Sequence, residues 1–320
     1  MSENVLVTGA GGFIGHHLVS FLKEKGYWVR GVDIKDPEYS ASSADEFKLL
    51  DLRKWESCLE ATQDIDVVYN LAADMGGIGY ITAFLADIAR NNTLINTHMI
   101  EAARTNKVER FFYSSSACIY PSYLQESPDV TPLKESDAYP ADPEEGYGWE
   151  KLYMEKMCQY YTEDYGLKTR VARFHNVYGP LGTYDGGKEK APAAICRKVA
   201  LADDGDKIEI WGDGQQTRSF MYIDDCVQGI YEIANSDNSN PLNLGMDQMI
   251  TVDQLVDIIS EVSGKTLIKK HDLTKPQGVR GRNSDNSELK NILGWAPEYS
   301  LHDGLAITYN WIKDELNNKK

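Results

Sequence analysis

The sequence predicts an α/β fold, in which a doubly wound parallel sheet is accompanied by a smaller C-terminal lobe. Apolar runs of strand length alternate with longer amphipathic patterns up to about residue 175, and glycine-rich loops and shorter elements follow. The length of 320 residues suits about two domains. We expect the first domain to comprise residues 1–175 plus about 220–246, and the second about 176–219 and 247–320.

The elements can be justified in chain order. NVLVTG at 4–9 is an apolar strand, and FIGHHLVSFLKEKG at 13–26 places apolar residues on one helical face and stops at a glycine. YWVRGVD at 27–33 is the next strand. Further buried strands are expected at 65–73, 108–117 and 167–174, with a helix at 92–106. Right-handed crossovers turn this order into a doubly wound sheet.

Composition and charge exclude several classes of protein. The formal charge of −16 opposes non-specific binding to nucleic acid, and no apolar run is long enough for a membrane span. The N-terminus enters structure without a leader pattern, so we expect a soluble, cytoplasmic protein. The five cysteines are widely spaced without CxxC, and the histidines form no HExxH. We therefore expect reduced thiols and no metal site.

The first strand–helix junction carries TGAGGFIG, with Gly9, Gly12 and Gly15. Glycines allow a tight turn and let backbone N–H groups approach a pyrophosphate at the helix N-terminus. Asp33 ends the second strand about 20 residues later, where a carboxylate accepts hydrogen bonds from a ribose 2′-OH and repels a 2′-phosphate. This motif predicts a Rossmann-type domain that binds NAD. Asp51 is a candidate for the adenine edge, with a surface turn as the alternative.

The stretch YGWEK places Tyr147 and Lys151 four residues apart, on one face of a helix that begins after Pro143. A lysine ammonium ~5 Å from a phenol, at an effective dielectric of about 20, favours the phenolate by roughly 3 kcal/mol and lowers the tyrosine pKa. Such a tyrosine can take a proton from an alcohol that a nicotinamide cofactor oxidises. Because YxxxK is common, a surface tyrosine is the alternative interpretation.

Together with NLAA at 70–73, the serines that end FFYSSSA, and RFHNVYGP, these motifs resemble the extended short-chain dehydrogenase/reductases that act on nucleotide sugars. The resemblance covers nearly the whole chain; Asn70 stands where that family often has histidine. It implies that Ser116 binds the sugar hydroxyl beside Tyr147 and that Lys151 holds the nicotinamide ribose. The implied NAD contacts are Gly9, Gly12, Phe13, Ile14, Gly15, Asp33, Asp51, Leu52, Leu71, Ala72, Ala73, Ser114, Tyr147 and Lys151.

Within that family, ADMGGIGYI, SSSACIYP, GGKEKAPAAICRK and GVRGRNSDN resemble the branch that inverts C3 and C5 of a GDP-hexose. The resemblance implies that Cys118 and Lys190 are the acid/base pair for the carbon-bound protons. It also implies a nucleotide-diphosphate sugar as substrate. The implied contacts to it are Gly76, Ser116, Asn176, Glu189, Lys190, Arg218, and Arg280 or Arg282. Arginine matches the geometry of phosphate, with surface arginines in loops as the alternative.

Reasoning from the residues supports the acid/base pair. If the strand continues through SSSAC, its period of two places Ser116 and Cys118 on the same side, and a nearby cation or helix end would lower the thiol pKa modestly. Lys190 lies just ahead of Pro192 at an expected helix start, where the helix dipole disfavours the charged amine. Without the resemblance, Cys118 would be interpreted as a small buried hydrophobe, as the other four cysteines are.

The expected reaction converts GDP-mannose to GDP-L-galactose through a transient 4-keto sugar. Proton removal and return at C3 and C5 follow oxidation at C4, and re-reduction completes the cycle. The sequence leaves open the base and sugar of the nucleotide, whether both centres invert, and which of Cys118 and Lys190 acts as acid or base at each centre. The alternatives are a 4-epimerase, a 4,6-dehydratase, and a non-catalytic dinucleotide sensor. The family suggests a homodimer built from the helices that flank Tyr147.

Overall fold

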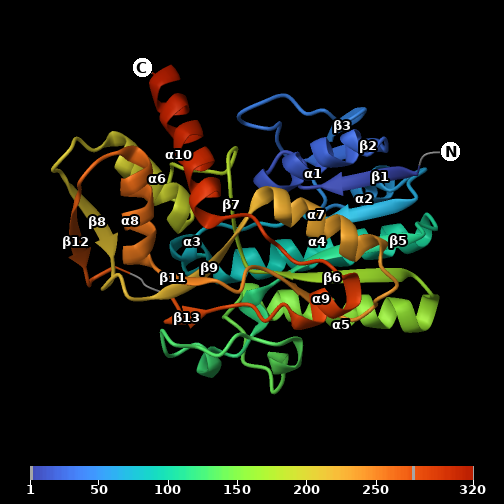
Figure 1. Ribbon diagram of the computed structural model, residues 1–320. Coiled ribbons are helices and arrows are strands. Elements are labelled where there is room, and N and C mark those ends of the chain that lie inside the picture. Colours follow the sequence, from blue (N-terminus) through green and yellow to red (C-terminus); the bar gives the residue numbers. More distant parts are fainter. Residues whose placement is uncertain (1–2, 276–277, 320) are drawn as a thin grey trace.

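The protein is described by a computed structural model that covers residues 3–275 and 278–319. Within these residues a seven-stranded, fully parallel sheet runs in the order β10-β6-β5-β4-β1-β2-β3 (Figure 1). Its strands are β1 (Asn4–Thr8), β2 (Trp28–Asp33), β3 (Glu46–Leu49), β4 (Val67–Asn70), β5 (Arg110–Ser116), β6 (Lys168–Phe174) and β10 (Leu242–Leu244). Every strand predicted up to residue 174 belongs to this sheet, so the predicted fold class is confirmed.

Helices pack on both faces of the sheet. On one face, α4 (Leu85–Thr105) packs against α2 (Trp55–Ala61) and α5 (Tyr147–Tyr165); on the other, α1 (Phe13–Glu24) packs against α7 (Ile223–Asn235). Successive side chains of β1 point to opposite faces of the sheet and enter two different hydrophobic cores. Val5 and Val7 pack with α1 and α7, whereas Leu6 packs with α2, α4 and α5. The strand order reverses between β1 and β4, and this is where such sheets open a ligand crevice.

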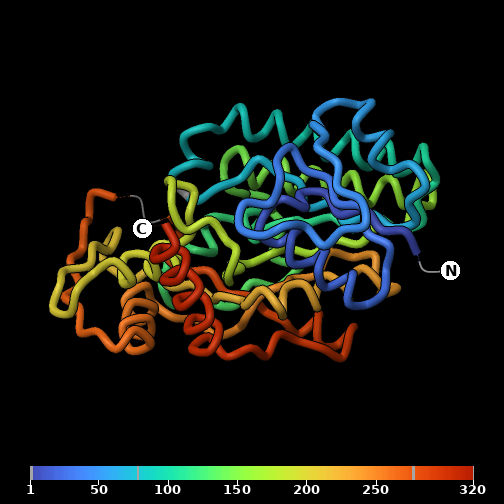
Figure 2. The backbone as a smooth tube through the Cα atoms, turned by 90° about the horizontal axis from the view of Figure 1, so that it is seen from above, coloured from blue at the N-terminus to red at the C-terminus, as the bar shows by residue number. Residues whose placement is uncertain are grey.

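A second layer of shorter elements follows β6. A four-stranded sheet contains β7 (Asn176–Tyr178), β9 (Thr217–Tyr222), β11 (Met249–Thr251) and β13 (Gly281–Arg282), and β8 (Lys207–Trp211) pairs in parallel with β12 (Ile268–Asp272). Helices α6 (Ala191–Leu201), α8 (Val252–Ser263) and α10 (Leu301–Asn318) pack together beside these strands. Figure 2 shows the yellow and orange segments of this layer gathered to one side of the blue-to-green sheet.

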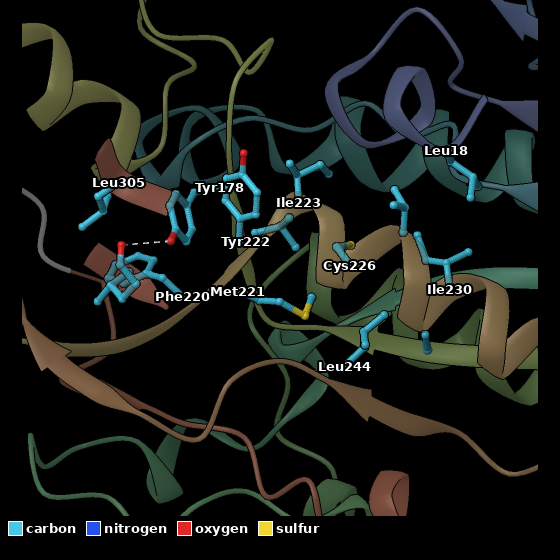
Figure 3. Packing of buried hydrophobic residues seen from close by; sticks show 14 of the residues in the cluster. Leu18, Tyr178, Phe220, Met221, Tyr222, Ile223, Cys226, Ile230, Leu244 and Leu305 are labelled. Atoms are coloured by element: carbon cyan, nitrogen blue, oxygen red, sulfur yellow. Dashed lines mark hydrogen bonds between the residues drawn. The ribbon is translucent and has the colours of Figure 1, made fainter. Parts of the chain in front are cut away.

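The two layers share one apolar core. Figure 3 shows its packing from Leu18 of α1, through Cys226 of α7, to Tyr222 and Tyr178. The Tyr178 hydroxyl donates to the carbonyl of Leu301, 3.2 Å away, and so ties β7 to the start of α10. Because this core continues from the sheet into the second layer, the elements that border the ligand crevice on both sides are held in fixed positions.

Two local expectations are corrected. The helix predicted at 92–106 begins earlier, at Leu85. Strand β5 ends at Ser116, and Cys118 lies in a 3₁₀ turn, Ala117–Ile119, so strand alternation does not place the two side chains together. The turn does so instead, because the Ser116 hydroxyl caps it and accepts a hydrogen bond from the Cys118 N–H at 3.2 Å. Short helices α3 (Ile78–Ala83) and α9 (Ser287–Leu293) complete the α-helices of the described residues.

In residues 3–275 and 278–319, no helix combines the length and the apolar character needed to cross a membrane.

Candidate active site

A pocket of about 600 Å³ opens at the carboxyl edge of the parallel sheet. It extends from the glycine-rich loop after β1 to Lys190 and Thr308 in the second layer. All fourteen residues predicted to contact NAD line it, as do Gly76, Ser116 and Lys190 from the predicted substrate set. The structure therefore brings the predicted cofactor site, the predicted catalytic tyrosine and lysine, and part of the predicted sugar site into one space.

The glycine-rich loop fits a dinucleotide pyrophosphate. Gly9 adopts a φ of +70°, and a Cβ on Gly15 would lie 2.1 Å from the Gly9 carbonyl oxygen, so neither position accepts a larger residue without rearrangement. Gly12 is the N-cap of α1 and brings no side chain between the first-turn amides and the pocket. A phosphate can thus reach the positive end of the helix.

The carboxylate of Asp33 is fixed at the end of β2. It accepts hydrogen bonds from the backbone N–H groups of Gly11 at 2.9 Å and Ile34 at 2.7 Å. Burial raises its pKa, and these backbone bonds oppose the rise. Asp51, at the other side of this end of the pocket, forms a bidentate ion pair with Arg53 at 2.8 and 2.9 Å, which lowers its pKa.

We expect Asp33→Asn to weaken NAD binding about tenfold and to reduce the preference for NAD over NADP, because the carboxylate that repels a 2′-phosphate is lost. Titration calorimetry with both dinucleotides measures this. Asp257→Asn is the matched control, since Asp257 is an exposed carboxylate that is paired with Lys269 and does not line the pocket. An unchanged ratio of the two dissociation constants in Asp33→Asn would contradict the prediction.

Sequence reasoning missed two buried side chains that position the loops around the pocket. Thr8 is fully buried; its hydroxyl donates to Asn70 at 2.9 Å and accepts the N–H groups of Leu71 and Ala72, both at 3.0 Å. Thr8 thereby fixes the loop that lines the pocket after β4. The position directly before the glycine motif was the available signal. The Asn70 amide nitrogen in turn donates to the Asn96 side-chain oxygen of α4 at 2.9 Å. An amide at position 70 can therefore accept from Thr8 and donate to Asn96 at the same time.

Glu150 is the second missed residue. It is 5% exposed and lies between Tyr147 and Lys151 in the sequence, and it accepts hydrogen bonds from Asn92 at 3.0 Å and Asn96 at 3.3 Å. Asn92 also holds the backbone of Asp74, accepting its N–H at 2.6 Å. Burial raises the pKa of Glu150. This buried network connects the helix of Tyr147 to the loop that carries Gly76.

Tyr147 is the first residue of α5, as predicted for a helix beginning after Pro143, and it is 5% exposed. Its phenol interacts with the Ser116 side chain, and the Lys151 ammonium lies 5.4 Å from the centre of its ring. Lys151 donates to the Ser114 carbonyl at 2.9 Å. The three side chains therefore meet as predicted.

The predicted electrostatics of Tyr147 are wrong in direction. Its pKa lies well above the ordinary value, first because the phenol is buried and then because of the nearby Glu150 carboxylate. Burial also lowers the pKa of Lys151. Desolvation outweighs the lysine–phenol attraction that the spacing suggested. Tyr147 is thus protonated in this arrangement and suited to hydrogen-bond an oxygen of a bound ligand.

Cys118 packs beside Tyr147 in a small buried cluster with Ile81 and Ile88. The Glu144 carboxylate acts electrostatically on its thiol, and an Arg282 nitrogen lies 3.5 Å from its sulfur. The pKa of the thiol is raised to about 11, first by burial and then by Glu144, and Arg282 lowers it in part. The expectation of a modestly lowered thiol pKa is therefore wrong, because desolvation exceeds the effect of the cation.

Lys190 occupies the N-cap position of α6, immediately before Ala191 and Pro192, as predicted. Burial lowers the pKa of its ammonium. The loop before it meets the loop after β4, because the Gly77 N–H donates to the Lys188 carbonyl at 3.2 Å and the Lys188 ammonium lies 3.8 Å from the centre of the Tyr80 ring. These contacts join the loop before Lys190 to the loop that carries Gly76.

The other predicted substrate contacts lie outside the pocket lining. Asn176 donates to the Ser219 carbonyl at 3.0 Å, and Glu189 accepts the Gly187 N–H at 2.6 Å. Arg218 donates to the carbonyls of Thr217 and Val279, at 2.7 and 2.6 Å. Arg280 pairs with Asp213 at 3.0 Å, whereas Arg282 lies beside Cys118. The two alternatives left open by the sequence, Arg280 and Arg282, thus have different surroundings.

Comparison with known proteins places the chain among sugar-nucleotide enzymes. The model of the NAD dependent epimerase/dehydratase family matches residues 5–245. GDP-mannose 3,5-epimerase of Arabidopsis thaliana is 49% identical over 323 residues, which cover 100% of this chain and 85% of that protein.

Solved structures are similar along the whole chain. UDP-glucose 4-epimerase of Thermotoga maritima, solved with UDP-glucose, superposes with a TM-score of 0.85 at 27% identity and covers 98% of this chain and 99% of its own. UDP-glucuronic acid 4-epimerase of Bacillus cereus, solved with UDP-glucuronic acid and NAD, superposes with a TM-score of 0.82 at 28% identity and the same coverage.

Proposed function

The chain belongs to the NAD dependent epimerase/dehydratase family, and from this premise we propose that it inverts C3 and C5 of GDP-mannose to give GDP-L-galactose. It is an isomerase with NAD as its cofactor. The observation that carries the proposal is the meeting of Ser116, Tyr147, Lys151 and Lys190 in one pocket that begins at the glycine-rich loop, with Cys118 packed against Tyr147.

The residues of the chain divide the chemistry between C4 and its neighbours. NAD, when bound, supplies the reversible oxidation of the C4 alcohol. Tyr147 accepts the hydroxyl proton through its phenolate, the minor form in the arrangement described above, and the Lys151 ammonium stabilises that phenolate before the transfer. Ser116 orients the same oxygen. The resulting 4-keto sugar has acidic protons at C3 and C5. Hydrogen bonds from Tyr147 and Ser116 to its oxygen stabilise the enolate formed when either proton leaves.

Cys118 and Lys190 move the carbon-bound protons. One takes a proton from one face of the sugar and the other returns a proton to the opposite face, which inverts the centre. The cation beside Cys118 favours its base form, and burial of Lys190 makes its ammonium a better proton donor. We therefore assign removal to Cys118 and return to Lys190.

We assign binding of the nucleotide sugar to side chains around the second layer. Gly76 lets the backbone approach the hexose, and Asn176 and Glu189 flank it. Arg218 is a candidate for the diphosphate, and Arg280 is the second candidate because it is partly exposed, with 30% of its side chain accessible.

We also propose a division of the chain into two domains. The NAD-binding domain comprises residues 1–175 with about 220–246, and the sugar-binding domain comprises about 176–219 and 247–320.

Incubation of the pure protein with GDP-mannose in heavy water tests the function. Deuterium at both C3 and C5, located by NMR, is the expected result. Deuterium at neither position, with an inverted C4, would replace the proposal by a single-centre 4-epimerase. Loss of water from the sugar would indicate a 4,6-dehydratase, and an unchanged sugar a non-catalytic protein.

We also propose that the protein is a homodimer. Trp149, Tyr153 and Tyr160 are 47%, 50% and 49% exposed and follow one another on one side of α5. Aromatic side chains so placed are typical of a helix face that packs against a partner.

Light scattering after gel filtration should give twice the chain mass of 35.9 kDa for the unmodified protein and the mass of one chain for Tyr153→Glu. Leu273→Glu changes a residue that is 69% exposed in the second layer and should leave the mass of the dimer unchanged. A single-chain mass for the unmodified protein would refute the dimer.

The thiol chemistry assigned to Cys118 favours a reducing compartment, and we propose the cytoplasm. The five cysteines are free and buried. Fractionation of source cells tests this, and recovery of the chain from an oxidising compartment would contradict it.

A further inference from the structure

Arg282 in β13 is buried against the thiol of Cys118. It is 7% exposed, and each of its three nitrogens has a partner within the chain. Nη1 lies 3.5 Å from the Cys118 sulfur, Nε donates to the Gln125 side-chain oxygen at 2.6 Å, and Nη2 pairs with the Glu144 carboxylate. Gln125 and Glu144 hold the guanidinium plane in place, so its contact with the sulfur is fixed.

These contacts argue against binding of the substrate diphosphate by Arg282, a role that the sequence left open. Two of the three nitrogens of Arg282 are bonded to Gln125 and Glu144. A diphosphate would have to displace both of these partners to gain a bidentate contact. The third nitrogen faces sulfur, and a guanidinium beside a thiol stabilises the thiolate.

We propose that Arg282 is a catalytic residue of the proton transfer, the counter-ion of the Cys118 thiolate, and that Glu144 moderates this ion pair by competing for the same guanidinium. The inference rests on the proposed function, in which Cys118 removes a carbon-bound proton.

Glu144 is positioned to act on both groups. Its backbone N–H donates to the Cys118 carbonyl at 2.9 Å, so the two residues are held together independently of their side chains. Its carboxylate accepts a hydrogen bond from Arg282 and lies within electrostatic range of the thiol. Although burial acts against it, Arg282 keeps the pKa of Glu144 below the ordinary value, so Glu144 is ionised at neutral pH. Glu144 and Arg282 therefore act on the thiol with opposite signs.

Other charged or titratable groups also face Cys118. Tyr147 and Lys151 approach it from α5, Lys190 from the start of α6, and Arg218 from β9, all within electrostatic range. The three cations favour the thiolate in the same sense as Arg282. Arg282 differs from them because its nitrogen is within hydrogen-bonding distance of the sulfur.

The arrangement gives a balanced proton transfer. The thiolate takes a proton from the sugar carbon and becomes a neutral thiol, and the electron pair of the broken C–H bond passes to the enolate oxygen. Arg282 remains compensated by Glu144 after the sulfur loses its charge. The Arg282 guanidinium thus has an anionic partner before and after the transfer, which avoids the cost of an unpaired buried charge at this position.

The thiol pKa of Cys118 tests the inference. Protein labelled with ¹³C at the cysteine Cβ is titrated by NMR without substrate, and the Cys118 signal is assigned by its loss in Cys118→Ala. We expect the midpoint to rise by about one pH unit in Arg282→Gln and to fall by about one pH unit in Glu144→Gln. Arg280→Gln, two residues away in the chain and paired with Asp213, is the matched control and should leave the midpoint unchanged.

Shifts of the same sign in both variants, or none in either, would overturn the inference. If Arg282→Gln does not fold, Glu144→Gln alone decides, because a midpoint that stays constant or rises contradicts the proposed competition. The titration involves no turnover. Opposite shifts in a protein that fails to label GDP-mannose would therefore refute the function only, and absent shifts in an active epimerase would refute the inference only.

Discussion

Replacement of Tyr147 by Phe is expected to lower turnover of GDP-mannose by about 10²- to 10⁴-fold, the usual contribution of a positioned acid or base. The substitution removes the only atom of this side chain that can exchange a proton with the C4 hydroxyl. The ring remains in its buried cluster with Cys118, Ile81 and Ile88, so the fold should persist. Deuterium incorporation at C3 and C5 should fall in parallel, because both steps require prior oxidation at C4.

The control for this prediction is Tyr153→Phe on the same helix. Tyr153 is 50% exposed, so loss of its hydroxyl should leave turnover within about twofold of the unmodified protein. NAD binding, measured by titration calorimetry, should survive in Tyr147→Phe. Near-normal turnover in Tyr147→Phe would exclude the tyrosine as the group that exchanges the hydroxyl proton.

Cys118→Ala is expected to separate the two halves of the reaction. NAD should still bind and C4 should still be oxidised, because Tyr147, Ser116 and Lys151 are unchanged. Proton removal at C3 and C5 should fall by about 10²-fold or more, because the side chain assigned as the base is absent. A rapid-quench experiment should find 4-keto sugar without carbon-bound deuterium, whereas normal deuterium uptake would refute the role of the thiol.

Cys158→Ala provides the matched control for Cys118→Ala. Cys158 is also a buried thiol and lies on α5, but it packs in the core under the sheet. Deuterium uptake should therefore be unchanged, and a modest loss of stability from the lost sulfur is the only expected effect. Equal loss of uptake in both variants would mean that packing, and not proton transfer, explains the effect of Cys118→Ala.

The sequence predicted most of the fold because its signals are local. Strand-length apolar runs, helix-period patterns and the glycine motif each report on neighbouring residues, and the resulting parallel sheet is confirmed. The resemblance to sugar-nucleotide enzymes is likewise confirmed by the family match. The local argument failed where a strand ended, because Cys118 reaches Ser116 through a 3₁₀ turn.

The electrostatics of the site required the tertiary structure. The spacing of Tyr147 and Lys151 suggested a lowered phenol pKa, yet burial and Glu150 raise it. A nearby cation suggested a lowered thiol pKa at Cys118, yet burial raises it to about 11. Desolvation depends on everything packed around a group, and spacing along one helix carries no information about that.

By itself, the sequence predicted the alternation of strands and helices up to residue 174. The glycine motif and the family resemblance supplied the candidates for the dinucleotide site and for the acid/base pair. Only the tertiary structure decided that Glu144 and Arg282, separated by more than a hundred residues in the chain, meet at the same sulfur atom. The physical reason is the range of the interactions involved. Periodicity and turn preferences act between neighbours in the chain, whereas charge and burial act between neighbours in space.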